Sequence, residues 1–242
     1  GVRILPVDSE HGAIFQCLQG RRPEEVAKLL VTASGGPHFR RPASEFSSIT
    51  VEQCLKHPTW NMGGKITIDS ATMFNKGLEV IEAHWLFHMP FDKIEVVIQP
   101  QSIIHSMIEF IDGSVLAQLG MPDMRLPIQY AFTYPERMTV RGARPIDWKT
   151  LGTLEFFPPD DEKFPSIGLA YEAGRIGGTM PCVLNEANEV AVYAFLRKEI
   201  SFTRIFDIVR TVMERHTVSH DVTLASIRQA DAWARRCAAS LL

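Results

Sequence analysis

The sequence predicts an α/β (α+β) domain with a lid loop, followed by a small C-terminal helical bundle. Short apolar runs of strand length recur in the first half of the chain. Apolar residues at three- and four-residue spacing fill residues 160–242, which is typical of helices. A segment rich in proline, glycine and charge lies between them, at residues 135–159. We therefore expect domains at residues 1–134 and 160–242, joined by a connecting segment.

Several apolar runs of the first domain are expected to form strands. They are Val2–Pro6, Leu29–Thr32, Lys65–Ile68 and Lys93–Ile98. A helix is expected to open at Asp69-Ser70 and to run to Phe87. The runs Ser102–Phe110 and Ser114–Leu119 flank an Asp-Gly pair, which predicts a β-hairpin.

Residues 38–64 differ in composition from the rest of this domain. They are rich in Arg, Pro, Ser, His, Trp and Gly, with only a short helical stretch near Val51–Lys56. Loops of this length are usually functional lids or disordered segments. Because Trp60 has no local apolar partner, we expect a mobile lid in which Trp60 packs over a ligand.

The second domain reads as helical throughout. The expected helices are Ile167–Ile176, Pro181–Leu196, Phe202–Arg215 and Leu224–Leu242. Ser201 and Thr223 are candidate N-caps, and Gly177-Gly178 is a stop signal.

The composition excludes several classes of protein. The chain has 242 residues and a formal net charge of −3, which argues against a general nucleic-acid binder. No apolar run approaches the roughly 18 residues that a membrane-spanning helix needs, and no secretory signal opens the chain. Four cysteines without a CxxC pair read as reduced, mostly buried thiols: Cys17, Cys54, Cys182 and Cys237. The first residue is Gly1 rather than Met, which suggests a missing upstream segment.

Asp8 and Glu10 are the first candidate metal ligands. At the end of a strand, side chains two residues apart lie on the same face, so their carboxylates would converge. Two adjacent carboxylates are unfavourable unless a cation or a proton joins them, and their oxygens suit Mg²⁺ or Mn²⁺. A third carboxylate could come from Glu79 or Glu82. A solvated strand end is the alternative.

Two turns are candidate phosphate cradles. Ser70, Asn75 and Lys76 lie near an expected strand-to-helix junction, where free backbone amides favour an anion. The segment Ser34-Gly35-Gly36 allows close approach of the backbone to a ligand. Each turn alone could be structural, but together with paired carboxylates they favour a phosphorylated small substrate. His105, on the expected hairpin, is either a core histidine or a site residue.

In combination these motifs resemble the 1-deoxy-D-xylulose 5-phosphate reductoisomerase family. The resemblance runs in order over essentially the whole chain. It rests on Pro6–Gln16, Ser34–Pro37, His57–Gly63, Asp69–Glu82, Pro100–Met107 and Asn185–Val192.

The resemblance implies an enzyme of the non-mevalonate isoprenoid pathway. Members rearrange 1-deoxy-D-xylulose 5-phosphate and reduce the product to 2-C-methyl-D-erythritol 4-phosphate. They use NADPH and a divalent metal, which is Mg²⁺, Mn²⁺ or Co²⁺. A homodimer is also implied, without nucleic-acid or membrane partners, in the bacterial cytoplasm or a plastid-type organelle.

The resemblance also assigns roles to residues. Asp8, Glu10 and Glu79 would bind the metal, which selects Glu79 over Glu82. Substrate would be bound by Ser9, Glu10, Ser34, His57, Trp60, Ser70, Asn75, Lys76 and Glu79, with the phosphate held by Ser34, Ser70, Asn75 and Lys76 beside His57. Lys76, Glu10 and His105 would be catalytic, and Trp60 and Met62 would belong to the lid. Met124 and Gly63 would contact the nicotinamide cofactor.

The sequence departs from the family pattern in two places. No dinucleotide-binding domain precedes the Asp8 motif, and no GxGxxG follows a strand, so we expect no hydride transfer by these residues alone. His38 interrupts the expected Gly-Pro-Phe-Arg pattern. A metal-dependent sugar-phosphate aldolase or isomerase without redox chemistry, or a non-catalytic binding module, are the alternatives.

Overall fold

The computed structural model describes residues 2–56 and 63–242. Contacts divide the chain into two compact units, which we treat separately. Unit 1 comprises residues 1–34 and 82–159, and unit 2 comprises residues 35–81 and 160–242. Their boundaries differ from the segments expected from the sequence, so the division at residues 134 and 159 stays a prediction. The predicted combination of an α/β part and a helical part is confirmed.

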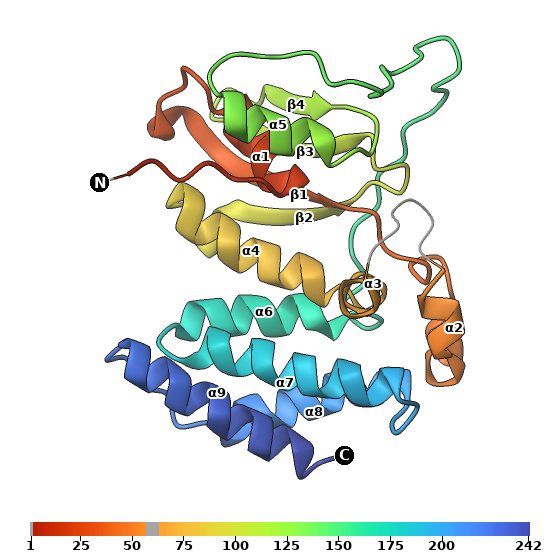
Figure 1. The fold of residues 1–242 in the computed structure, drawn as a ribbon, viewed down its shortest axis with the longest axis vertical. Coiled ribbons are helices and arrows are strands. Elements are labelled where there is room, and N and C mark those ends of the chain that lie inside the picture. Colours follow the sequence, from red (N-terminus) through yellow and green to blue (C-terminus); the bar gives the residue numbers. More distant parts are fainter. Residues whose placement is uncertain (1, 57–62) are drawn as a thin grey trace. The chain divides into compact units, whose positions relative to one another are not determined.

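Unit 1 contains a four-stranded sheet (Figure 1). Its strands are β1 (Val26–Ala33), β2 (Ile94–Ile98), β3 (Ile104–Phe110) and β4 (Val115–Leu119), in the order β2-β1-β3-β4. β1 pairs with β2 in parallel and with β3 antiparallel, with Leu29 opposite both Ile94 and Ile108. Side chains from β1, β2 and β3 fill the core, among them Leu29, Val31, Ile98 and Ile108.

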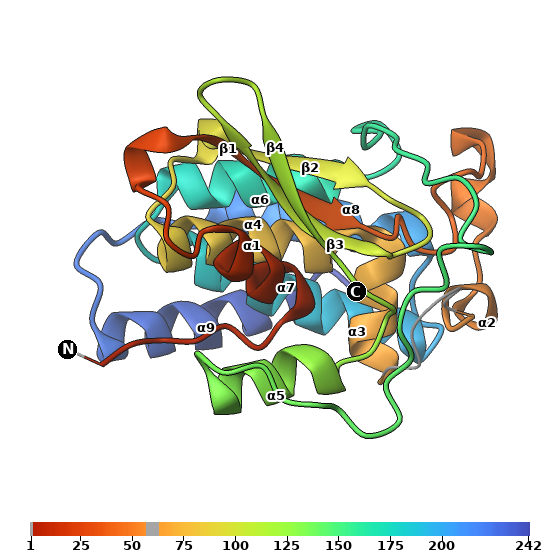
Figure 2. The same ribbon diagram turned by 90° about the horizontal axis from the view of Figure 1, so that it is seen from above.

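The β3–β4 hairpin confirms the prediction from the Asp-Gly pair. The Asp112 carboxylate accepts hydrogen bonds from the Ser114 backbone N–H (2.9 Å) and hydroxyl (2.6 Å). Gly113 has φ +82°, a conformation that glycine adopts without steric cost. Figure 2 shows the resulting turn at one end of the sheet.

Helix α1 (Ser9–Cys17) packs against β3 and β4, and this corrects one prediction. Val2–Pro6 is not a strand, and the chain enters a helix directly after Asp8. Asp8 is the N-cap, and its carboxylate accepts a hydrogen bond from the Ser9 backbone N–H (2.8 Å). Unit 1 also holds α5 (Arg125–Thr133), which the sequence did not predict, and the short 3₁₀ helices Pro23–Glu25 and Phe91–Lys93.

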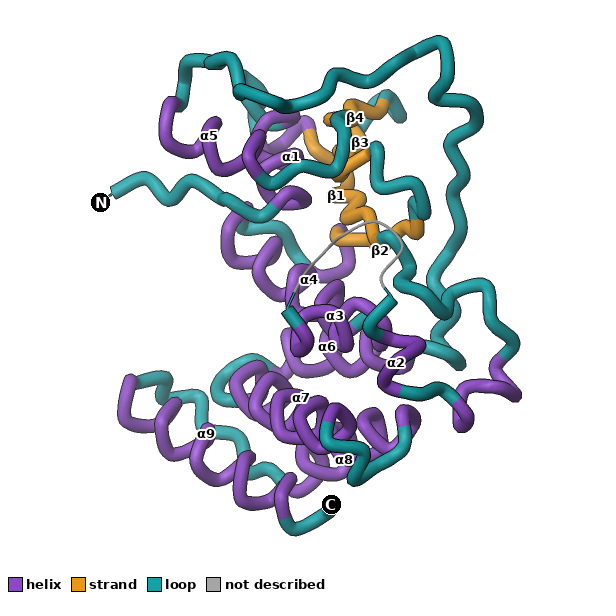
Figure 3. Tube along the Cα trace, turned by 45° about the vertical axis from the view of Figure 1, so that its right-hand side comes forward, coloured by secondary structure: helices purple, strands orange, loops and turns teal. Residues whose placement is uncertain are grey.

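Unit 2 is helical, and all strands of the described chain lie in unit 1 (Figure 3). Its helices are α2 (Val51–Cys54), α3 (Gly64–Thr72), α6 (Pro165–Ile176), α7 (Met180–Leu196), α8 (Phe202–Arg215) and α9 (Leu224–Ala239), with a 3₁₀ helix at Ala43–Ser48. Helix α7 packs against α6, α8 and α9. Thr223 caps α9 by accepting a hydrogen bond from the Ser226 backbone N–H, and Gly177 ends α6 at φ +69°. The four predicted C-terminal helices are confirmed.

Residues 64–87 form two helices instead of the predicted strand and single helix. Lys65–Ile68 belongs to α3, because Thr67, Ile68, Ala71 and Thr72 are buried at helical spacing. Met73 is left-handed (φ 60°) and ends α3, after which α4 (Phe74–Phe87) begins. Helix α4 starts in unit 2 and ends in unit 1.

A cluster of aromatic side chains lies in the core of unit 2. Phe202 is fully buried and contacts the rings of Phe46, Phe195 and Phe206 at centroid distances of 5.7–5.8 Å. Such contacts stabilise the unit through burial and edge-to-face geometry. None of the described helices is long and apolar enough to span a membrane.

The predicted lid is only partly described. The predicted helix near Val51–Lys56 is confirmed as α2, and it ends at Cys54. His57, Trp60 and Met62 lie outside the described residues, so their roles remain predictions. All four cysteines are free thiols, as expected, but the prediction that most are buried is wrong: only Cys54 is buried, and Cys17, Cys182 and Cys237 are half-buried.

His38 is buried in unit 2, where its Nε2 lies 3.3 Å from the Sγ atom of Cys54. Burial lowers the pKa of His38 to about 4 and raises the pKa of the Cys54 thiol to about 12. The thiol is therefore protonated and can donate to the neutral imidazole.

This pair gives the stability of unit 2 a pH dependence. The pKa of His38 is lower in the folded state than the usual 6.5. The neutral His38 side chain therefore contributes fully to the free energy of unfolding above pH 6.5, and this contribution is lost as the pH falls toward 4. The loss amounts to about 3 kcal/mol. We expect His38→Phe to flatten the urea-unfolding free energy between pH 6.5 and pH 4. An unchanged pH slope in the variant would contradict this assignment.

Candidate metal and phosphate site

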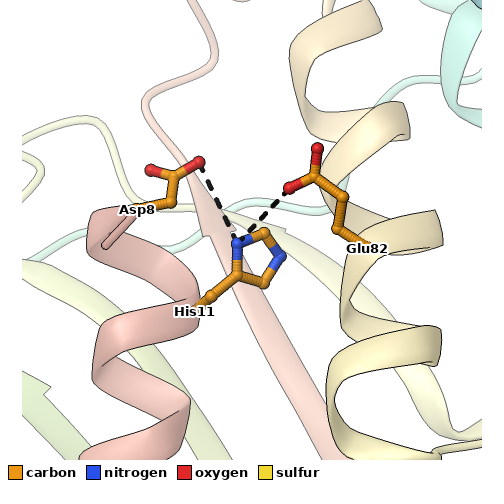
Figure 4. Close-up of side chains that lie close together, drawn as sticks. All are labelled: Asp8, His11 and Glu82. Atoms are coloured by element: carbon orange, nitrogen blue, oxygen red, sulfur yellow. Dashed lines mark ion pairs between the residues drawn. The ribbon is translucent and has the colours of Figure 1, made fainter. Parts of the chain in front are cut away.

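A carboxylate–histidine cluster lies at the start of α1 in unit 1 (Figure 4). The Nδ1 atom of His11 lies 3.9 Å from an Asp8 carboxylate oxygen and 3.6 Å from a Glu82 carboxylate oxygen. His11 is 1% exposed, whereas the Asp8 and Glu82 side chains are about half exposed. Each residue offers one ligand atom, and the three atoms lie within 4.8 Å of one another.

Oxygen ligands with one imidazole suit divalent ions such as Mn²⁺ or Co²⁺. The sequence reasoning missed His11 because it placed this segment on a strand. In a helix, Asp8 and His11 are three residues apart and lie on one face. A helical interpretation of residues 9–17 would therefore have identified the pair.

The carboxylates of Asp8 and Glu10 converge as predicted, but not because they share a strand face. Asp8 is the N-cap of α1 and Glu10 lies in its first turn, and a carboxylate oxygen of each lies within 4.8 Å of the other's. The Glu10 carboxylate accepts a hydrogen bond from the Ser9 hydroxyl (2.6 Å). This contact links one predicted metal ligand to one predicted substrate-binding residue.

A cavity of about 240 Å³ in unit 1 brings two predicted site residues together. Ser9 and His105 both line it, and His105 is 8% exposed. The sequence reasoning missed its other polar lining residues, which include Gln118, Asp123 and Arg137. Hydrogen bonds from Arg125 lower the pKa of the Asp123 carboxyl against the opposing effect of burial. The cavity is thus lined by both polar and apolar side chains, and its polar groups include acceptors and donors.

The two residues predicted to contact the nicotinamide belong to different units. Met124, in unit 1, precedes α5 and is its N-cap. Gly63, in unit 2, is the N-cap of α3 and is exposed. Their common role therefore stays a prediction.

In unit 2 the segment after β1 approaches α3 closely. Gly35 and Gly36 have φ +81° and +65°. A Cβ atom added to Gly36 would lie 2.6 Å from the Ser70 carbonyl oxygen, so only glycine fits without a shift of backbone. The close approach is to the backbone of α3 rather than to a ligand, and it joins Gly36 to the predicted phosphate-binding residue Ser70. Approach of this segment to a ligand stays a prediction. Ser34, in unit 1, directly precedes this segment.

Gly36→Ala is expected to destabilise unit 2 by about 2 kcal/mol or more, because it adds a clash to an unfavourable φ. Gly20→Ala is the matched control, since Gly20 has φ +72° but nothing within 4 Å of the added Cβ. Urea unfolding of both variants measures the difference. Equal losses of stability would show that the contact with Ser70 contributes nothing.

The prediction that a helix opens at Ser70 is wrong, because Ser70 lies in the last turn of α3. The nearby helix N-terminus is that of α4, whose first residues are Phe74, Asn75 and Lys76. The first amides of a helix lack intrahelical acceptors and favour an anion. A helix N-terminus therefore does lie at this junction, but it is that of α4, and phosphate binding there stays a prediction.

Asn75, Lys76 and Glu79 form a hydrogen-bonded group on α4. The two oxygens of Glu79 accept from the Asn75 side-chain amide and from the Lys76 ammonium group. Lys76 is 5% exposed and Glu79 is 2% exposed. Three residues to which the sequence assigned substrate or metal binding are thus in direct contact.

A second buried carboxylate, Asp69, joins α3 to α7. It accepts from the Asn188 side-chain amide (2.8 Å) and pairs with Lys65 (2.6 Å). Burial raises the pKa of Asp69, against the lowering effects of Lys65 and Asn188. This network holds the turn that carries Ser70 against the longest helix of unit 2. No local sequence signal predicts it, because Asp69 and Asn188 are 119 residues apart.

Together, these features place a cluster of candidate divalent-metal ligands on an α/β unit and a helix N-terminus suited to an anion on a helical unit. Residues 4–87 match the 1-deoxy-D-xylulose 5-phosphate reductoisomerase C-terminal domain, and residues 119–237 match the DXP reductoisomerase C-terminal domain. The chain belongs to the 1-deoxy-D-xylulose 5-phosphate reductoisomerase family.

Named relatives and solved structures agree with this assignment. The reductoisomerase of Acetivibrio thermocellus is 57% identical over 98% of the chain, and that of a Geobacillus strain is 54% identical over the whole chain. The chain spans 62% and 64% of the length of these relatives.

Two solved structures superpose closely. The Zymomonas mobilis reductoisomerase in complex with NADPH is 46% identical, with a TM-score of 0.91 over 98% of this chain and 61% of that one. A DOX-P reductoisomerase in complex with NADPH, fosmidomycin and magnesium is 41% identical, with a TM-score of 0.93 over 99% of this chain and 63% of that one.

Proposed function

We propose that this protein acts in the conversion of 1-deoxy-D-xylulose 5-phosphate to 2-C-methyl-D-erythritol 4-phosphate, with NADPH and a divalent cation. The identity of 54–57% to reductoisomerases over 98–100% of the chain carries this proposal. The magnesium and NADPH of the solved relatives support the choice of cofactors. The carboxylates of α1 and the buried donors of α4 supply chemistry of the required kind.

Asp8, Glu10 and Glu79 are the proposed metal ligands. All three are carboxylates, which suit Mg²⁺ and Mn²⁺, and Asp8 already belongs to a cluster of candidate ligand atoms. When bound, the metal would supply Lewis-acid stabilisation to substrate oxygens. Glu82 is the alternative third carboxylate, because it lies close to His11 in unit 1.

The substrate phosphate is assigned to Ser34, Ser70, Asn75 and Lys76, with His57 nearby. Lys76 and the first amides of α4 provide positive charge and donors, and Gly36 allows the backbone to approach Ser70. The phosphate lies away from the reacting carbons. Its binding energy can therefore be used to orient the substrate and to close the segment that carries Trp60.

The reaction breaks and re-forms a carbon–carbon bond before hydride reduces the resulting aldehyde. Ser9 and Lys76 would bind substrate oxygens, and Glu10 and His105 would hold or move protons beside them. The shared cavity of Ser9 and His105 supports this division of roles. NADPH would supply the hydride, with Met124 and Gly63 against the nicotinamide.

A homodimer and a cytoplasmic or plastid-type location are parts of the same proposal. They follow from family membership alone. Size-exclusion chromatography with light scattering would test the dimer.

The experiment that tests this function uses the full-length gene product. Incubation with 1-deoxy-D-xylulose 5-phosphate, Mg²⁺ and NADPH should consume NADPH and substrate in equal amounts. Conversion of the sugar phosphate without NADPH consumption would instead favour an aldolase or isomerase.

A further inference from the structure

Glu79 occupies the donors that the proposed function assigns to the substrate phosphate. Its Oε1 atom accepts from Asn75 and its Oε2 atom accepts from Lys76, and all three residues lie in the first turns of α4. Lys76 and Glu79 are both at least nine-tenths buried. The carboxylate proposed for the metal and the donors proposed for the phosphate therefore satisfy each other.

Two physical effects make these interactions compete with a phosphate. A phosphate that binds Lys76 and Asn75 comes close to the Glu79 carboxylate, and like charges in a buried site repel. The buried Glu79 carboxylate would also lose donors that compensate its desolvation. A divalent cation on Glu79 would relieve both effects, because it neutralises the carboxylate and replaces Asn75 and Lys76 as its partner.

We infer that Glu79 couples the two ligands, so that a divalent cation and a phosphate group bind with positive cooperativity. The inference rests on the proposed function, which assigns metal to Glu79 and phosphate to Asn75 and Lys76. By linkage, the factor by which the cation tightens phosphate binding equals the factor by which phosphate tightens cation binding.

The test uses Mg²⁺ and methyl phosphate. This monophosphate lacks the neighbouring carbonyl and hydroxyl oxygens through which a sugar phosphate can chelate a metal. Calorimetry or ³¹P NMR gives the Kd of methyl phosphate for the chain in EDTA and in saturating Mg²⁺. We expect Mg²⁺ to tighten methyl phosphate binding about tenfold, and methyl phosphate to tighten Mg²⁺ binding by the same factor. These measurements need no variant, so they are decisive even where a substitution impairs folding.

Glu79→Gln and Glu172→Gln separate coupling through Glu79 from general electrostatic attraction. Both substitutions remove one negative charge from unit 2, but Glu172 is exposed and lies on α6. In EDTA we expect Glu79→Gln to bind methyl phosphate about tenfold more tightly than the wild type, with Mg²⁺ adding little. Glu172→Gln should bind it as the wild type does.

The outcomes distinguish the inference from the proposed function. Equal tightening in both variants, or no effect of Mg²⁺ on the wild type, would overturn the coupling and leave the phosphate site intact. Absence of methyl phosphate binding under every condition, or equal binding by Lys76→Met, would overturn the phosphate assignment and the coupling with it.

Discussion

Glu79→Gln is expected to lower the affinity of the chain for Mn²⁺ by at least about 100-fold, because it replaces a carboxylate ligand by a weak neutral donor. Changes to residues that merely orient ligands already cost about 10–100-fold in metal affinity. Glutamine preserves the size of the side chain and can still accept hydrogen bonds from Asn75 and Lys76. The loss should therefore report metal binding rather than unfolding. Titration followed by the electron paramagnetic resonance of free Mn²⁺ measures the affinity.

Glu82→Gln is the informative comparison, because it tests the other candidate third carboxylate. If Asp8, Glu10 and Glu79 bind the metal, Glu82→Gln should change the affinity by less than about threefold, as expected for a residue outside the ligand set. A large loss in Glu82→Gln with little change in Glu79→Gln would reassign the metal to Asp8, His11 and Glu82, whose candidate ligand atoms lie within 4.8 Å of one another. His11→Gln would then reduce the affinity as well.

The elements that the sequence predicted well are those with long or strongly punctuated patterns. The C-terminal helices have apolar residues at helical spacing over several turns, and the β3–β4 hairpin has an Asp-Gly turn. The failures are short segments. Val2–Pro6 and Lys65–Ile68 are only a few residues long, and alternation over such a length does not distinguish a strand from a helix.

The composition of the candidate site was easier to predict than its geometry. The carboxylates of Asp8 and Glu10 were correctly expected to converge, but an N-cap and a first-turn residue replace the predicted strand face. The contact of Lys76 with Glu79 follows from helical spacing and could have been predicted. The left-handed Met73 that separates α3 from α4 could not, because few residues other than glycine adopt that conformation. Contacts such as that between Asp69 and Asn188 depend on tertiary packing alone.

A polypeptide limited to these 242 residues is expected to oxidise NADPH at least ~10³-fold more slowly than a full-length reductoisomerase such as that of Acetivibrio thermocellus. The reason is that correct orientation of the two reactants supplies much of the rate enhancement. Hydride transfer requires the nicotinamide to lie against the substrate aldehyde. The sequence of these 242 residues has no GxGxxG turn between a strand and a helix that would bind the pyrophosphate. Met124 and Gly63 could contact only the ring.

The measurement is NADPH absorbance with 1-deoxy-D-xylulose 5-phosphate and Mg²⁺, for both proteins under the same conditions. Mn²⁺ and methyl phosphate binding by the 242-residue polypeptide controls for folding, since the proposed metal and phosphate ligands are all present in it. The expected result is that Mn²⁺ and methyl phosphate still bind while NADPH is not oxidised. This result would show that residues outside this polypeptide supply most of the binding energy for the cofactor. Comparable rates from the two proteins would show that residues 1–242 bind the whole dinucleotide. The binding site for the cofactor would then have to lie on surfaces to which other roles are assigned, and the first candidate is the cavity of unit 1 that Ser9 and His105 line.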